Sequence, residues 1–193
     1  MTRKDSEKDN ASARRAAIVK AATDIMRDEG YAAVTSRKIA ERAGLKSKLV
    51  HYYFKSMDEL FLSIYRTGGE QYHKRQALAL ASANPLRGLW ELNADSFNTR
   101  VLQELIALAN HHEPLRDEIA RESKRSRLLQ AETFEKAMSK FPATMPQLAP
   151  EFLSLLLTAA ARLISMDRAL GVKVGHAEAK AWISQLLDQI EQA

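Results

Sequence analysis

The sequence predicts an all-α protein, and three observations lead to this prediction. Its 193 residues include only 7 glycines and 5 prolines, the two residues that most often interrupt helices. Apolar residues recur at three- and four-residue spacing along most of the chain, as they do on the buried face of a helix. Strand-length stretches that alternate apolar and polar residues are hard to find.

The first third of the chain predicts a helix behind a polar segment. Residues 1–12 carry no apolar periodicity, so we expect a flexible arm there. A first helix is expected from about residue 13 to residue 29, because apolar side chains then fall on one face. Gly30 follows as its C-terminal cap.

Two short helices and a capping box come next. Thr35 is a suitable N-cap for a second helix over residues 36–43, which Gly44 ends. After this turn, a third helix is expected over residues 47–53. The segment "SMDE" at residues 56–59 matches a capping box and predicts the start of a longer fourth helix.

The remaining two thirds of the chain predict helices separated by short breaks. Prolines that follow an asparagine, a glutamate and an alanine mark three helix starts. The expected helices span residues 57–82, 85–96, 98–111, 115–140, 151–170 and 176–191, with a proline-rich loop at 141–150.

The net charge of +5 is distributed unevenly along the chain. Residues 1–66 contain 14 Lys and Arg against 9 Asp and Glu, whereas residues 67–193 contain 15 of each kind. Positive side chains that displace counterions from phosphates supply most non-specific affinity for nucleic acids. The asymmetry predicts a polyanion-binding module ahead of a neutral one, and a merely solvated basic face is the alternative.

Composition excludes several classes of chemistry. The chain has no cysteine, so disulfides, thiolate nucleophiles and cysteine-ligated zinc are excluded. The N-terminus lacks a signal-peptide core, and the longest strongly apolar run, residues 152–161, is too short to cross a bilayer. We therefore expect a cytoplasmic protein that does not contact a membrane.

The pair His111-His112 beside Glu113 invites a metal or acid-base interpretation. Adjacent helical residues point about 100° apart, so the pair offers no chelating face. The sequence also contains no recognisable catalytic triad and no glycine-rich phosphate loop. We expect neither an enzyme nor a bound metal or cofactor.

The two short helices around Gly44 have the proportions of a helix-turn-helix, whose second helix enters the DNA major groove. On that helix Lys48 and Tyr52 share a face, with His51 beside them, while Val50 and Phe54 point away. The exposed face predicts a binding surface, because lysine and tyrosine both donate to phosphate oxygens. Tyr53 fits either this surface or the core.

The segment "DEGYAAVTSRKIAERAGLKSKLVHYYFKSMDEL" resembles the TetR-type transcriptional regulators, named for the tetracycline repressor. The resemblance covers roughly residues 14–65. It implies a dimeric all-α repressor with an arm at 1–12, a DNA-binding domain at 13–56 and an effector-binding and dimerisation domain at 57–193. By the same resemblance, DNA contacts fall to Ser36, Arg37, Lys46, Ser47, Lys48, His51, Tyr52 and Tyr53.

Three positions depart from the family pattern. Leu49 replaces the usual threonine, His51 the usual tyrosine, and Met57 a lysine common at the start of the fourth helix. Leu49 cannot donate to a phosphate, although it could contact a thymine methyl group. The operator sequence therefore cannot be taken from a relative.

The region after residue 57 resembles the family only in length and helical pattern. Large inward-facing side chains are candidates for lining an effector cavity, with plain core packing as the alternative. These candidates are Trp90, Phe97, Phe134 and Met138. The absence of an obvious cluster of convergent charges favours an apolar or amphipathic small molecule as the effector.

The last two expected helices carry apolar stripes that could pair with the same helices of a second copy. Burial against the preceding helices is the competing explanation. The candidate interface residues are Leu155, Ala159, Leu163, Trp182, Leu186 and Ile190. A two-fold homodimer would place two recognition helices about 34–36 Å apart, which matches a palindromic operator on double-stranded DNA.

The function predicted from these features is that of a ligand-responsive repressor, released from its operator by a small molecule. The alternative is a basic helical protein that binds DNA non-specifically and has no effector.

Overall fold

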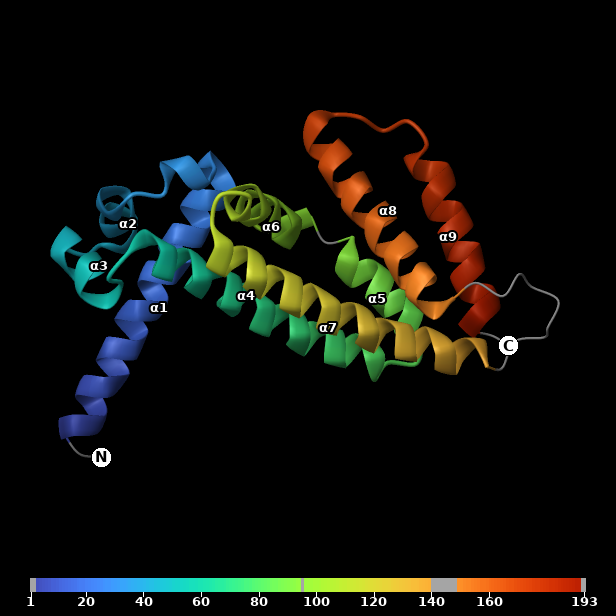
Figure 1. Ribbon diagram of the computed structural model, residues 1–193, viewed down its shortest axis with the longest axis horizontal. Coiled ribbons are helices and arrows are strands. Elements are labelled where there is room, and N and C mark those ends of the chain that lie inside the picture. The colour runs from blue at the N-terminus through green and yellow to red at the C-terminus, as the bar shows by residue number, and fades with distance from the viewer. Residues whose placement is uncertain (1–2, 95, 140–148, 192–193) are drawn as a thin grey trace. The chain divides into compact units, whose positions relative to one another are not determined.

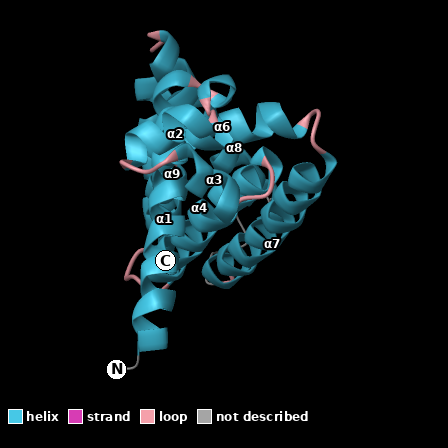
Figure 2. Cartoon of the chain, turned by 90° about the vertical axis from the view of Figure 1, so that its left-hand side faces the viewer, coloured by secondary structure: helices cyan, strands magenta, loops and turns pink. Residues whose placement is uncertain are grey.

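The computed structural model describes residues 3–94, 96–139 and 149–191, and the side chains of this part except those of residues 3–9 and 96–98. In the described part every regular element is a helix, as Figure 2 shows. This confirms the predicted all-α fold. None of the described helices combines the length and apolarity needed to cross a membrane.

Packing divides the chain into two units. The first comprises Met1–Gly68 and Arg100–Ile119, and the second comprises Gly69–Thr99 and Ala120–Ala193. Two long helices, α4 (Met57–Leu80) and α7 (Glu113–Met138), contribute to both units. The domain boundaries expected from the sequence stay a prediction, because packing does not show which residues bind an effector.

The first unit is built on the helix α1 (Arg3–Glu29). Packed with it are the 3-10 turn η1 (Tyr31–Ala33), α2 (Ser36–Ala43), α3 (Ser47–Tyr53), the beginning of α4, α6 (Ser96–Ala109) and the beginning of α7. Their fully buried side chains, such as Ile18, Met26, Ile39 and Leu60, form one apolar core. The apolar stripe of α1 thus anchors the two short helices.

The expected start of the first helix near residue 13 is wrong, because α1 begins at Arg3. The flexibility of the arm stays a prediction. Residues 3–12 contain neither glycine nor proline. Adding a residue to an existing helix avoids the entropic cost of nucleation, so a polar segment can continue a helix that is anchored downstream.

Local capping explains the boundaries around α2 and α4. The Lys38 N–H donates to the Thr35 hydroxyl at 3.4 Å, which confirms Thr35 as the N-cap of α2. At the start of α4, the Glu59 N–H donates to Ser56 Oγ at 3.1 Å, and the Glu59 carboxylate accepts from the Lys55 N–H at 3.0 Å. The capping box predicted at residues 56–59 is confirmed.

Two polar contacts attach α6 and α7 to the other helices of the first unit. Glu104 on α6 accepts from the Tyr31 N–H at 2.8 Å, beside the turn that Gly30 makes. Glu118 on α7 lies 3.1 Å from Arg66 on α4 and raises the pKa of that guanidinium by hydrogen bonding and charge. These contacts fix residues 100–119 to the unit that contains α2 and α3.

The second unit contains α5 (Pro85–Asn93), α8 (Pro150–Leu170) and α9 (His176–Glu191), with the later parts of α4 and α7. In Figure 1, α8 and α9 run side by side in opposite directions, and α5 packs against both. Gly88 brings α5 close to α4, since a Cβ there would lie 3.0 Å from that of Ala79.

Apart from the start of α1, the observed helices begin and end within a few residues of the predicted ranges. Most of the loop predicted at 141–150 lies outside the described residues, and Pro150 is already the first residue of α8. Proline suits this position because the first helical residue needs no N–H partner.

Candidate nucleic-acid interface

The helices α2 and α3 are held in a fixed relation by the turn between them. Gly44 has a φ of 64°, in the left-handed region, and the Leu45 N–H donates to the Ala40 carbonyl at 2.8 Å. Ala40 on α2 and Val50 on α3 are both buried in the core that these helices share with α1. This packing directs the opposite face of α3 to the solvent.

Acidic residues at the end of α1 neutralise part of the positive charge on α2. Lys38 lies 2.5 Å from Glu29, and Arg42 lies 3.4 Å from Glu29 and 3.6 Å from Asp28. The pKa of Asp28 is lowered, mainly by its hydrogen bond with Arg27 and further by Arg42. Lys38 and Arg42 are therefore structural cations, although they belong to the same basic stretch as the candidate DNA contacts.

Three other basic side chains of this stretch are exposed to solvent. Arg37, Lys46 and Lys48 are exposed, and in the described part of the chain no ion pair engages them. Ser47 and His51 are exposed as well. The basic side chains of α2 and α3 thus form two groups. Those beside the end of α1 pair with acidic residues, whereas those on and around the exposed face of α3 have no acidic partner among the described residues.

Tyr52 and Tyr53 have different environments. Tyr52 is 77% exposed, whereas Tyr53 is partly buried against the core of the first unit. Their rings meet edge to face, with centroids 5.1 Å apart, so the buried ring limits the motion of the exposed one. Ser36 and Leu49 are also only partly exposed, which limits the surface that either can offer.

One exposed cation beside α3 was not singled out from the sequence. The Arg15 guanidinium on α1 lies 4.6 Å from the centroid of Phe54, the residue that follows α3. Arg15 precedes the buried Ile18 by three residues, a spacing that places it next to the apolar stripe of α1. This spacing is the sequence feature from which the position of Arg15 could have been predicted.

Residues 18–64, which include α2, the turn and α3, match the family model of bacterial regulatory proteins, tetR family. This segment of the chain belongs to the TetR family of helix-turn-helix transcription regulators. The predicted DNA-binding class is therefore confirmed for this segment.

A curated relative matches one segment of the chain. The HTH-type transcriptional regulator BetI from Rhizobium meliloti (strain 1021) is 41% identical over 54 residues. The matched segment covers 28% of this chain and 27% of BetI, so the chain spans only about a quarter of the curated relative that it matches.

Solved structures resemble the fold of the chain over nearly its full length. A Saccharomonospora viridis protein, crystallised in complex with choline, has a TM-score of 0.76 at 19% identity, covering 94% of this chain and 93% of its own. A TetR transcription regulator from Haloarcula marismortui has a TM-score of 0.74 at 16% identity, covering 91% and 96% respectively. At these identities the likeness shows a shared fold.

Three of the four candidate effector residues fall in one apolar cluster of the second unit. Phe134 is fully buried there beside Leu86, and Trp90 and Met138 are partly buried against the same cluster. The side chain of Phe97 lies outside the described residues. The burial of Phe134 fits core packing, and a role in effector binding stays a prediction for all four residues.

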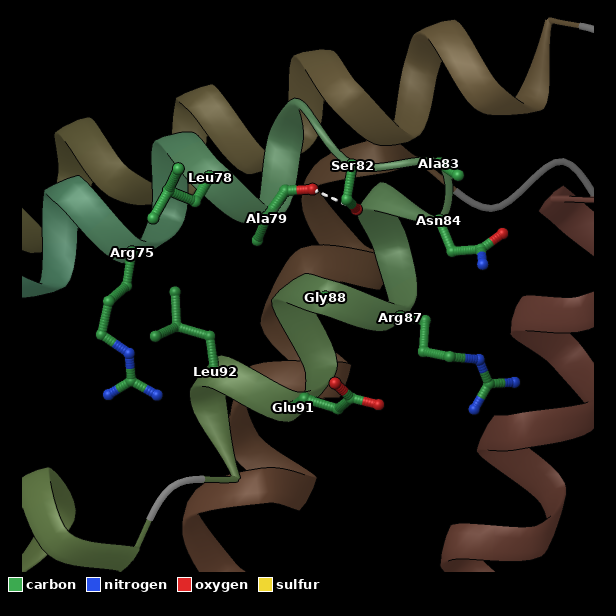
Figure 3. Close-up of a pocket in the computed structure, with 10 residues that line it drawn as sticks. All are labelled: Arg75, Leu78, Ala79, Ser82, Ala83, Asn84, Arg87, Gly88, Glu91 and Leu92. Carbon is green, nitrogen blue, oxygen red and sulfur yellow. Dashed lines mark hydrogen bonds between the residues drawn. The ribbon is translucent and has the colours of Figure 1, made fainter.

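The second unit also contains two open pockets, which are lined by residues other than those of this apolar cluster. The first, of about 610 Å³, is shown in Figure 3: Arg75, Arg87 and Glu91 lie around Gly88. Arg87 is itself held by Asp188 at 2.6 Å. The second, of about 490 Å³, is lined by His73, Gln76, Ala77, Leu80, Ala81, Arg125, Ser126 and Leu129.

Buried polar side chains link four helices of the second unit. Tyr72 on α4 donates to Asn93 on α5 at 2.9 Å and accepts from Gln130 on α7 at 3.1 Å. Ser154 on α8 donates to Gln130 at 3.1 Å. Burial raises the pKa of the Tyr72 hydroxyl. The interior of this unit is therefore more polar than the sequence pattern indicated.

The predicted dimer residues separate into exposed and buried sets. Leu155, Ala159 and Leu163 are exposed on α8, and Trp182 is 54% exposed on α9. Leu186 is partly buried and Ile190 is 5% exposed, both against the core of the second unit. Ile190 thus lies in the core of its own unit, and the dimer interface itself stays a prediction.

His112 has a structural role near the start of α7. Its Nδ1 accepts from the Leu115 N–H at 3.0 Å, and its Nε2 lies 3.2 Å from Asp58 in the first turn of α4. The ring thereby satisfies a free N–H group of α7. His111, by contrast, is exposed.

Proposed function

We propose that the protein is a ligand-responsive transcriptional repressor that binds a palindromic operator as a homodimer. The observation that carries this proposal is the exposed face at and beside α3, where Lys46 and Lys48 have no ion-pair partner among the described residues and Tyr52 is 77% exposed. Lysine and tyrosine in this arrangement bind phosphates and base edges, and the second helix of a helix-turn-helix carries such contacts.

The apolar stripe of α8 supports the homodimer. Phe152, Leu155, Leu163, Met166 and Leu170 are all exposed, and with Ala159 they recur every three or four residues along the helix. Trp182 on α9 adds a large exposed ring. A stripe of this length favours burial against an identical stripe, because isologous contacts cover both surfaces at once.

The effector is proposed to bind in the second unit, as the family resemblance implies. Its chemistry stays open between an apolar or amphipathic molecule and one that exchanges hydrogen bonds with the network around Tyr72 and Gln130. The structural relative from Saccharomonospora viridis was crystallised with choline, so choline is a reasonable first probe. An effector releases DNA only by as much as it prefers the non-binding conformation.

The test is a salt-titrated binding assay with the DNA upstream of the protein's own gene and with random DNA of equal length. The proposal predicts at least a hundredfold preference for one natural fragment, about 2.7 kcal/mol. Equal and steeply salt-dependent binding to all fragments would support the alternative of a non-specific basic protein without an effector.

A further inference from the structure

Arg15 is held beside the recognition helix by an aromatic ring. Its guanidinium lies 4.6 Å from the centroid of Phe54, which is 2% exposed and whose N–H donates to the Val50 carbonyl at 2.9 Å. Because Phe54 is fixed at the C-terminal end of α3, it also fixes the position of the Arg15 head group. A side chain of α1 is thus placed at the end of α3 within the same unit.

Arg15 differs from two other cations of α1 in its interaction partners. Lys20 pairs with Asp24 at 2.8 Å, and Arg27 pairs with Asp28 at 2.9 Å. Within the described residues no carboxylate pairs with Arg15, which remains exposed although it stacks on the ring. Stacking uses the face of the guanidinium and leaves the N–H groups at its edge free to donate.

We propose that Arg15 is a further contact to the DNA backbone, donating to a phosphate that flanks the bases approached by α3. This inference rests on the proposed DNA-binding function. Stacking on Phe54 restricts the long side chain before binding, so less conformational entropy is lost when the phosphate is bound. A guanidinium edge also matches the geometry of phosphate oxygens. A backbone contact of this kind positions α3 but does not read sequence.

The experiment compares Arg15→Met and Arg15→Lys with the parent protein, using salt titrations on random duplex DNA and on the preferred natural fragment. Methionine keeps an apolar stem over the ring and removes the charge. We expect Arg15→Met to reduce the slope of log affinity against log salt by about 0.9 per bound protomer. Affinity should fall by the same factor on both DNAs, and Arg15→Lys should retain the parental slope.

Lys20→Gln is the matched control, because it removes the same charge from the same helix. Lys20 lies five residues further along α1 and is turned about 140° around the axis. This variant should keep the parental slope. If Lys20→Gln lowered the slope as much as Arg15→Met, the effect would be one of net charge and the inference would be wrong.

Other outcomes separate the inference from the proposed function. An unchanged slope in Arg15→Met, together with a reduced slope in Lys48→Ala, would overturn the contact and leave the DNA-binding proposal intact. A loss of preference between the two DNAs would mean that Arg15 reads bases, which also contradicts a backbone contact. Failure of the parent protein to bind any duplex would overturn both. Thermal melting of each variant verifies that the first unit is folded.

Discussion

Lys48 and Tyr52 lie one helical turn apart on α3, and both are exposed. We expect Lys48→Ala and Tyr52→Ala each to weaken operator binding by about 1–3 kcal/mol, because each removes a donor from the proposed DNA-facing surface. The melting temperature and the oligomeric state should not change, since neither side chain contributes to the core. Fluorescence anisotropy with a labelled operator measures the affinity, and undiminished binding in both variants would rule out this face.

Tyr72 gives the protein a predicted sensitivity to alkaline pH. Burial raises the pKa of its hydroxyl above the ordinary value near 10. Between the two pKa values the folded state keeps a proton that the unfolded state loses, so the contribution to stability is complete below the unfolded pKa and falls as pH rises.

The comparison with Tyr72→Phe tests this dependence. At pH 8 the variant should be less stable by about 1 kcal/mol, because it loses the hydrogen bonds with Asn93 and Gln130. Above pH 10 the difference should shrink, since phenylalanine cannot ionise. Urea denaturation at several pH values measures it, and a constant difference up to pH 11 would contradict the account.

At the scale of whole elements, glycine has different roles in α4 and α5. A Cβ at Gly68 would meet no atom within 4 Å, whereas one at Gly88 would lie 3.0 Å from the Cβ and 3.2 Å from the Cα of Ala79. We therefore expect Gly68→Ala to stabilise the protein by about 0.5–1 kcal/mol. Gly88→Ala should destabilise it by about 1–3 kcal/mol through overpacking. Chemical denaturation distinguishes the two, and equal effects would show that α5 does not depend on this close approach.

The helix boundaries were predictable because their causes are local. Thr35, Gly44 and the capping box at residues 56–59 determine helix ends through bonds within a few residues. The early start of α1 was missed, since a polar helical extension has no apolar period to detect.

The arrangement of side chains in the candidate sites was harder to predict from the sequence. The pairing of Lys38 and Arg42 with acids of α1, and the stacking of Arg15 on Phe54, are tertiary contacts. Periodicity likewise identified the apolar stripe of α9 but could not show that Ile190 faces the core of its own unit. Such a distinction requires the position of neighbouring helices.

For the molecule as a whole, the exposed stripe of α8 predicts its assembly. Leu163 is 58% exposed in the middle of this stripe. We expect Leu163→Glu to convert the proposed dimer to a monomer, because a two-fold contact would bury two carboxylates near each other. Sedimentation velocity measures the change. Leu78→Glu is the control, since Leu78 is 74% exposed on α4 and should leave the dimer intact. A monomeric parent protein would contradict the proposed interface.

The most direct test of the central claim is a selection of binding sites from random duplex DNA by the purified full-length protein. We expect enrichment of an inverted repeat whose half-sites are centred about one helical turn apart, or a multiple of it, because in the proposed dimer two copies of α3 approach the DNA around a two-fold axis. Enrichment of no sequence, under salt conditions in which the protein binds the starting pool, would contradict sequence-specific regulation by this chain.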